Sequence, residues 1–172
     1  MSRRAIVTLL VTFFAMPALA AEMPPRKVGL WEIQAGGSGA AFRQCIDAAT
    51  DQALQARGGA GVGPAGVSPQ CSKHDVQKSG DIMTIDATCT TAGKTVTSHA
   101  VVTGSFDSAY TMTVTAQGDG IPGGSHTTTV TAKWLGSCAA NQRPGDMIMP
   151  NGMTVNILDL QKRALPGGPP AH

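Results

Sequence analysis

Apolar and polar residues alternate through residues 81 to 136 in four runs that share one register. Successive side chains of a β-strand point to opposite faces of a sheet, so this alternation predicts strands with one apolar and one polar face. In the first run Met83 and Ile85 fall on the apolar face, and Thr84 and Asp86 fall on the other. Threonine is β-branched and suits a solvated pleated surface. We therefore expect an antiparallel meander with a Thr-rich outer face.

Short turns between these runs predict which residues lie opposite one another, because the turn length sets the register of a hairpin. The expected pairs are Met83 with Val102, Ile85 with Ala100, Ala87 with Ser98, Cys89 with Val96, Val102 with Tyr110, and Met112 with Val130. Each pair keeps the apolar residues on one side of the sheet.

Residues 26 to 34 and 40 to 46 predict two further strands. Asp47 is placed to cap a short helix that ends before Gly58, and Thr154 to cap a second helix that runs to about residue 164. We expect an all-β fold. It would be an antiparallel meander of six or seven strands, curled into a half-barrel or small barrel, with one or two short helices.

The amino terminus has the pattern of a secretory signal peptide, which we assign to residues 1 to 20. Arg3 and Arg4 precede an apolar run, and the segment ends in Ala-Leu-Ala at 18 to 20. The run is shorter than the roughly 20 residues that span a bilayer, so no stable membrane anchor is expected after cleavage. The predicted location is the periplasm or the extracellular space.

The length of 172 residues predicts one folded domain, which we place at residues 21 to 138. Residues 139 to 172 are expected to be an extension with a short helix and a disordered tail. Loss of Arg3 and Arg4 with the signal would lower the formal charge from +2 to 0. A chain without net charge or a basic cluster is a poor nucleic-acid binder, and we expect no nucleic-acid partner.

Four cysteines in an exported chain predict two disulfides. A hairpin between residues 71 to 78 and 82 to 89 would put Cys71 directly opposite Cys89. The remaining pair, Cys45 and Cys138, would then tie an early strand to the end of the meander.

Three short motifs occur in a distinctive order. They are Val-Gly-Leu-Trp-Glu-Ile at 28 to 33, Arg-Gln-Cys-Ile at 43 to 46, and Trp-Leu-Gly-Ser-Cys at 134 to 138. With the Cys-to-Cys hairpin between them, they resemble a secreted bacterial family, the Domain of Unknown Function 3617. The resemblance implies a β-rich domain of the cell envelope with paired cysteines and no established activity. It does not extend to the Gly-rich insert at 58 to 70 or to the C-terminal extension.

The apolar face near Trp31, Tyr110, Met112 and Trp134 is a candidate surface for a small apolar ligand or a protein partner. The Gly-Leu-Trp at 29 to 31 is also similar to the Gly-x-Trp of lipocalins, which suggests a small-ligand carrier as an alternative. A packed core is the other possibility, because most apolar side chains of this face are small and a short chain needs them for its stability. We expect a non-enzymatic binding or structural module without a cofactor, since no catalytic constellation is recognisable.

A metal-binding or stress protein is the second alternative. The hairpin register expected around Gly80 places His74 opposite Asp86, and Asp86 opposite His99, which would align three zinc ligands on the outer face. The alternative is a solvated row that binds no metal, in which Asp86 only raises the pKa values of the histidines.

The extension is rich in methionine. Met147, Met149 and Met153 are candidate copper ligands, because thioethers prefer Cu(I). Simple packing of these side chains is the other possibility.

Overall fold

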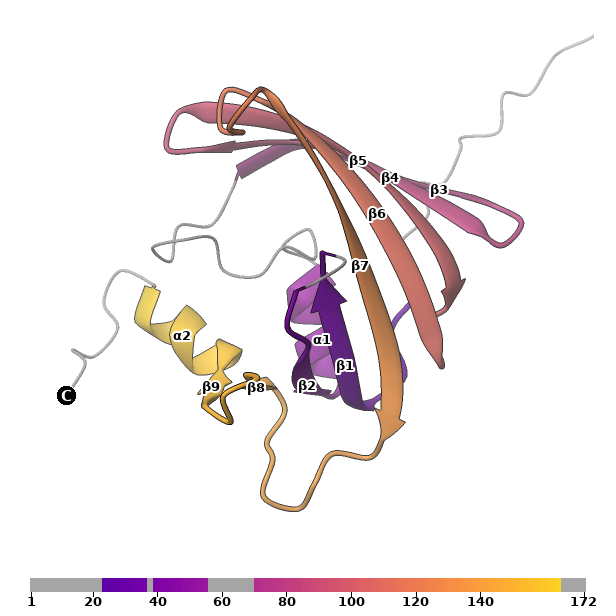
Figure 1. The fold of residues 1–172 in the computed structure, drawn as a ribbon, viewed down its shortest axis with the longest axis vertical. Helices are drawn as coiled ribbons and strands as arrows, with labels where there is room; N and C mark the ends of the chain where they lie inside the picture. The colour runs from indigo at the N-terminus through magenta and orange to yellow at the C-terminus, as the bar shows by residue number, and fades with distance from the viewer. Residues whose placement is uncertain (1–22, 37–38, 56–69, 165–172) are drawn as a thin grey trace, which may run out of the picture.

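The computed structural model describes residues 23–36, 39–55 and 70–164. These residues form one antiparallel sheet with two short helices, so the fold is mostly β (Figure 1). The elements are β1 (Gly29–Ala35), β2 (Phe42–Ile46), α1 (Ala48–Gln55), β3 (Gln70–Ser79), β4 (Ile82–Thr91), β5 (Lys94–Ser105), β6 (Ala109–Gly118), β7 (Ser125–Gly136), β8 (Asp146–Ile148), β9 (Thr154–Asn156) and α2 (Ile157–Ala164). The predicted signal peptide, Gly-rich insert and C-terminal tail lie outside the described residues, except for Gln70 at the end of the insert.

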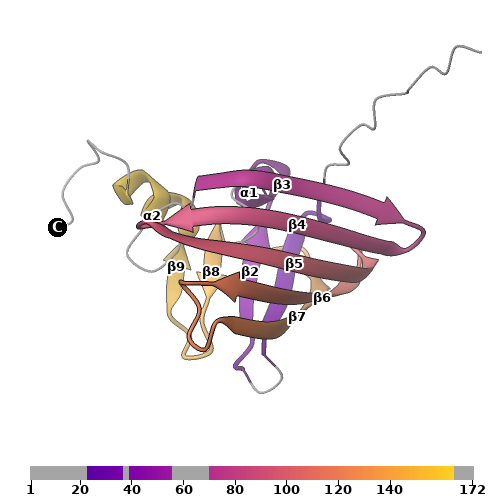
Figure 2. The same cartoon turned by 90° about the horizontal axis from the view of Figure 1, so that it is seen from above.

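The sheet has the strand order β3-β4-β5-β6-β7-β1-β2-β8-β9. The long strands β3 to β7 follow one another through short turns and form the predicted meander (Figure 2). Strand β1 pairs with the free side of β7, and β2, β8 and β9 continue the sheet beyond it. The N-terminal strands therefore sit between the meander and the C-terminal strands.

The sheet is open, which corrects the expectation of a half-barrel or small barrel. A barrel requires its first and last strands to pair, but β3 and β9 lie at opposite ends of the strand order. The three residues of β9 also offer too few backbone groups to match the ten residues of β3. For the same reason, the expectation of a lipocalin-like shape is wrong. The sheet has nine strands rather than six or seven, and β8 and β9 come from the extension.

Most of the expected registers are confirmed. All four pairs predicted between β4 and β5 are present, and Met112 lies opposite Val130. Val102 lies opposite Met112 rather than Tyr110, because the turn between β5 and β6 is centred on residues 106 to 108. A shift of two residues leaves every side chain on its expected face. The predicted set of residues on the apolar face is therefore still correct.

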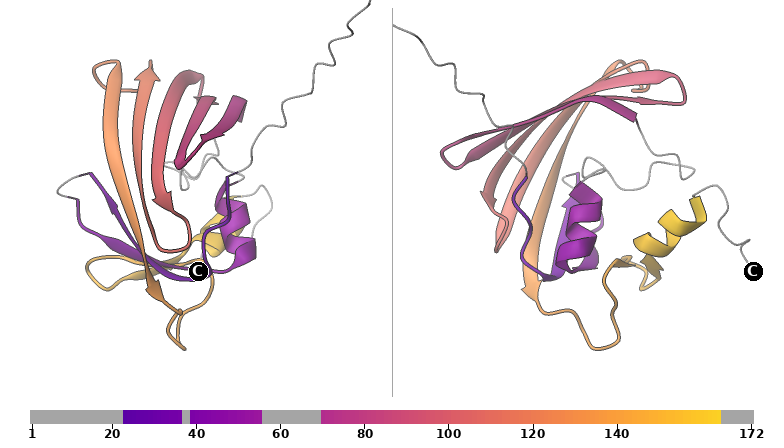
Figure 3. Two further views of the ribbon diagram at one scale, coloured as in Figure 1. Left: turned by 90° about the vertical axis from the view of Figure 1, so that its right-hand side faces the viewer. Right: turned by 180° about the vertical axis from the view of Figure 1, so that it is seen from behind.

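The inner face of the sheet carries two groups of buried apolar residues. One consists of Val76, Met83, Ile85, Ala100 and Val102 on β3 to β5, and the other of Trp31, Ile33, Ile46 and Ala132 on β1, β2 and β7. Tyr110 of β6 packs against both groups. Helix α1 packs against β2 on the inner side of the sheet, beneath the arch of the long strands (Figure 3). It begins as predicted, with the Asp47 carboxylate accepting a hydrogen bond from the Thr50 N–H at 2.7 Å.

Candidate functional site

Two tryptophans mark the junction between the N-terminal strands and the meander. Trp31 of β1 lies opposite Trp134 of β7, and its side chain is fully buried. The indole N–H of Trp31 donates to the Lys27 carbonyl at 2.7 Å, and that of Trp134 donates to the Val28 carbonyl at 3.1 Å. The Lys27 ammonium stands 3.7 Å from the Trp134 ring centroid. Trp31 is thus part of the packed core and has no surface to offer a ligand.

Gly29 makes the close approach of β1 to β7 possible. Its φ is +134°, and a Cβ at this position would collide with the Gly136 carbonyl oxygen. Only glycine meets both demands without strain. This gives the Gly-Leu-Trp motif a structural reason within an open sheet.

Tyr110 connects the tryptophan junction to the rest of the inner face. Its ring centroid lies 5.8 Å from that of Trp31 and 4.7 Å from that of Phe106, which stacks on it. Burial raises the pKa of the Tyr110 hydroxyl, and the negative charge of Asp51 raises it further. The positive charge of Arg26 and a hydrogen bond with its side chain lower the pKa and offset part of that rise. The folded state therefore favours the neutral hydroxyl.

The inner face of β6 is less covered than that of β5. Met112 and Val114 are only partly buried, whereas Val102 and Ala100, which lie opposite them on β5, are buried. The apolar face is thus packed beside Trp31 and partly open along β6. Sequence patterning placed these residues on one face, but it could not show where that face is covered.

A buried ion pair beside Tyr110 was not predicted. Arg26 Nε lies 2.7 Å from Asp51 Oδ1, and the two side chains are 9% and 0% exposed. The second carboxylate oxygen accepts from the Arg26 backbone N–H at 2.7 Å and from the Gln55 amide at 2.8 Å. Burial of a charge is tolerated only with such partners. The cluster fastens the segment before β1 to α1, and no local sequence signal indicates it because the two residues are 25 positions apart.

The predicted zinc row is not formed, and the expectation that His74 lies opposite Asp86 is wrong. The hairpin turns through two residues, Gly80 and Asp81, and a bulge at Ser72 restores the register only at the cysteines. Between these points His74 lies opposite Ala87, on the same face as the buried Val76. Val76 is the signal that was missed, since the expected register would have put it on the polar face.

Asp86 and His99 do lie opposite each other, as expected. The His99 Nδ1 is 2.9 Å from Asp86 Oδ1, and this hydrogen bond lowers the pKa of the carboxyl group. The third neighbour in the row is Asp75, a second carboxylate in place of the expected imidazole. Among the described residues, no group of three or more His, Cys, Asp and Glu side chains is arranged to hold a metal ion.

A shallow hollow of about 400 Å³ opens on the outer face, near the ends of β5, β6, β7 and β1. Its lining includes the polar side chains of Glu32, Gln34, Lys133 and several threonines. The hollow lies across the sheet from the apolar face, so it does not correspond to the predicted ligand surface.

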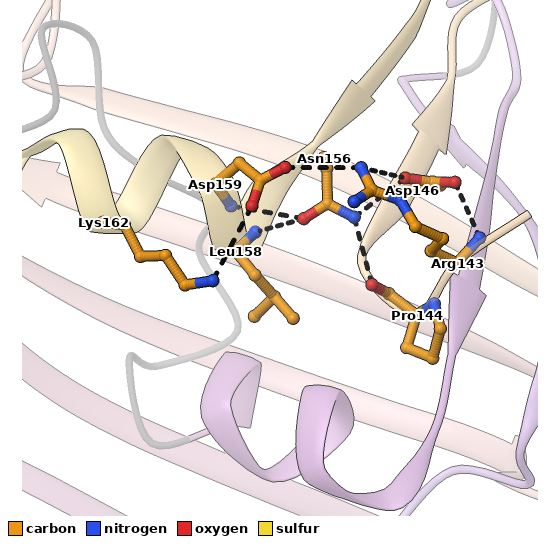
Figure 4. Close-up of polar contacts among 7 residues, drawn as sticks. All are labelled: Arg143, Pro144, Asp146, Asn156, Leu158, Asp159 and Lys162. Carbon is orange, nitrogen blue, oxygen red and sulfur yellow. Dashed lines mark hydrogen bonds and ion pairs between the residues drawn. The ribbon is translucent and has the colours of Figure 1, made fainter. Parts of the chain in front are cut away.

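The C-terminal segment is held by Asn156 (Figure 4). Its side-chain oxygen accepts from the backbone N–H groups of Leu158 and Asp159, at 3.0 and 3.2 Å, and caps α2. Its amide donates to the buried Asp146 at 2.8 Å and to the Pro144 carbonyl at 3.1 Å. The expectation that Thr154 caps the helix is therefore wrong, because residues 154 to 156 form β9.

Both predicted disulfides are present. Cys71 is bonded to Cys89 across the β3–β4 hairpin, and Cys45 is bonded to Cys138. Cys71 is exposed, whereas Cys45 is 1% exposed within the core. Disulfides persist in oxidising compartments, so this pattern fits an extracytoplasmic protein. None of the described helices is long and apolar enough to cross a membrane.

The fold and the disulfides define a small, mostly β protein built on one open antiparallel sheet. A family model described as "protein of unknown function (DUF3617)" matches residues 25–138. The chain belongs to this family, as its motifs indicated. No curated protein and no solved structure matches the chain.

Proposed function

We propose that the protein is a non-catalytic binding module of the cell envelope, which holds an apolar ligand or an apolar segment of a partner on the inner face of β6. The observation that carries this proposal is the partial burial of Met112 and Val114 next to the buried Val102. Apolar side chains that remain open beside a finished core are typical of a binding surface. Tyr110 and Phe106 add aromatic area at one end of it.

The rigidity of the surroundings supports this role. The two disulfides and the buried Arg26–Asp51 pair hold the sheet on both sides of β6. A preformed face loses little conformational entropy when it binds, which favours affinity.

Binding of an anilinonaphthalene sulfonate dye tests the proposal. We expect the native protein to bind the dye, and palmitate to displace it. Val114→Lys should abolish binding, because it puts a charge on the inner face. Thr113→Lys is the matched control, since the neighbouring residue points to the outer face, and it should bind the dye like the wild type.

Thermal unfolding of both variants separates loss of the face from loss of the fold. Dye binding that appears only after partial unfolding would contradict the proposal. The inner face would then be a closed core, and the protein a structural module.

A further inference from the structure

The hairpin of β8 and β9 collects three of the eight methionines of the chain on one face. Met147 pairs with Val155 in the ladder, and the Met149 backbone N–H donates to the Met153 carbonyl at 2.8 Å, which continues the same register two positions further on. Met149 and Met153 are therefore directly opposite each other, and Met147 lies two residues before Met149, on β8. Side chains at these positions share a face, and opposed Cβ atoms in antiparallel strands are roughly 5 Å apart.

The turn between Met149 and Met153 is built to keep this arrangement. The Gly152 N–H donates to the Met149 carbonyl at 2.9 Å, and Gly152 has a φ of +82°, which other residues rarely adopt. The Asn151 side-chain oxygen accepts from the Met153 N–H at 3.0 Å. These bonds hold Met149 and Met153 opposite each other.

The rest of the C-terminal segment anchors the hairpin to the sheet. Gln44 of β2 lies opposite Met147, and the Gly145 N–H donates to the Cys45 carbonyl at 2.9 Å. Cys45 is itself held by its disulfide to Cys138. Asn156 and Asp146 bridge the other face of the hairpin at 2.8 Å.

These methionines do not serve the main core. None of the three belongs to the two buried apolar groups or to the residues packed against them. Met153 is 55% exposed, and Met147 and Met149 are partly buried. Met153, a large apolar side chain at an exposed tight turn, gains little from burial, so packing alone does not explain its position.

We propose that Met147, Met149 and Met153 form a site for a soft monovalent cation, Cu(I), bound by three thioethers. Thioether sulfur prefers Cu(I) to harder divalent ions such as Zn²⁺. Because a thioether carries no proton to displace, binding does not weaken as the pH falls through the range in which histidine sites lose their metal. The site lies outside the family-matched residues 25–138 and is independent of the apolar face of β6.

Titration of the full disulfide-bonded chain with Ag(I), a redox-inert probe for Cu(I) sites, tests this proposal. The protein is labelled with ¹³C in the methionine methyl groups and kept in chloride-free buffer. We expect the methyl signals of Met147, Met149 and Met153 to shift together and to saturate at one equivalent. Native mass spectrometry should show one bound ion, and Zn²⁺ should leave the three signals unchanged.

Variants assign the binding to the hairpin. Each single Met→Leu change in the trio should weaken binding by at least the roughly 10–100-fold that loss of an outer-shell partner causes at metal sites. Met149→Leu combined with Met153→Leu should abolish it. Met83→Leu is the matched control, a buried core methionine on β4 that should have no effect. Leucine conserves the volume of methionine, so the fold is retained.

Three results would overturn the site. They are no Ag(I) binding, binding that survives in the double variant, and shifts confined to methionines outside the trio. Dye binding to β6 is measured separately, so failure of one proposal leaves the other standing.

Discussion

The two halves of the sheet are held together by different means. Strands β3 to β7 are joined by short turns, and their disulfide spans a sequence separation of only 18 residues. In the other half, β1 and β2 come from the start of the described chain and β8 and β9 from its end, and their disulfide spans 93 residues. The buried Arg26–Asp51 pair adds a further non-local connection. The first half is thus specified by neighbours in sequence and the second by long-range contacts.

Removal of each disulfide should show this difference most strongly. In the chain-entropy model, Cys45→Ser with Cys138→Ser should cost about 4–5 kcal/mol, because a long loop is released. Cys71→Ser with Cys89→Ser should cost about 3 kcal/mol. Urea unfolding of the two double variants measures both values. An equal or larger loss from the hairpin disulfide would contradict the comparison.

Breaking the buried ion pair should have the next largest effect. Arg26→Leu leaves the fully buried Asp51 carboxylate without its counter-charge, and we expect a loss of about 3–5 kcal/mol in the free energy of unfolding. Arg43→Leu is the matched control. Its partner Glu32 is 3.4 Å away, and the two side chains are 56% and 37% exposed, so the loss should stay below about 1 kcal/mol. Similar losses in the two variants would show that the buried pair has no special role.

The helix cap tests the C-terminal edge of the second half. Asn156→Ala should lower the free energy of unfolding by about 1–2 kcal/mol, because α2 loses its N-cap. Thr154→Ala removes the residue that the sequence suggested as the cap, and it should change stability by less than about 0.5 kcal/mol. Chemical denaturation of the two variants compares them, and the reverse order would restore Thr154 as the cap.

The smallest effect concerns Tyr110, which touches both halves. Its pKa is raised above the ordinary 10.0, so the folded state favours the neutral hydroxyl. This contribution to stability is complete below pH 10 and is lost as the pH rises through the pKa of the folded state. Tyr110 is the only tyrosine of the chain, so tyrosinate absorbance reports it directly. Titration at the ordinary pKa would show that the hydroxyl is solvated.

The candidate sites were predictable to different degrees. The Cys71–Cys89 bridge and the contact of Asp86 with His99 follow from alternation and turn length, and both are present. The zinc row failed at His74, because a one-residue error in the turn sends every side chain up to the bulge to the other face. The methionine trio was visible as a composition, whereas its common face needed the observed turn at Gly152.

The sequence by itself determined the meander, its apolar face, the start of α1 and the Cys71–Cys89 bridge, which left Cys45 and Cys138 as the remaining pair. These features depend on alternation, turns and caps, which act over a few residues. Only the tertiary structure decided that the sheet stays open, that Trp31 is sealed in the core, and that Arg26 meets Asp51. Each of these depends on contacts between segments that are distant in the sequence. Such contacts form only when the whole chain folds, so no local pattern specifies them.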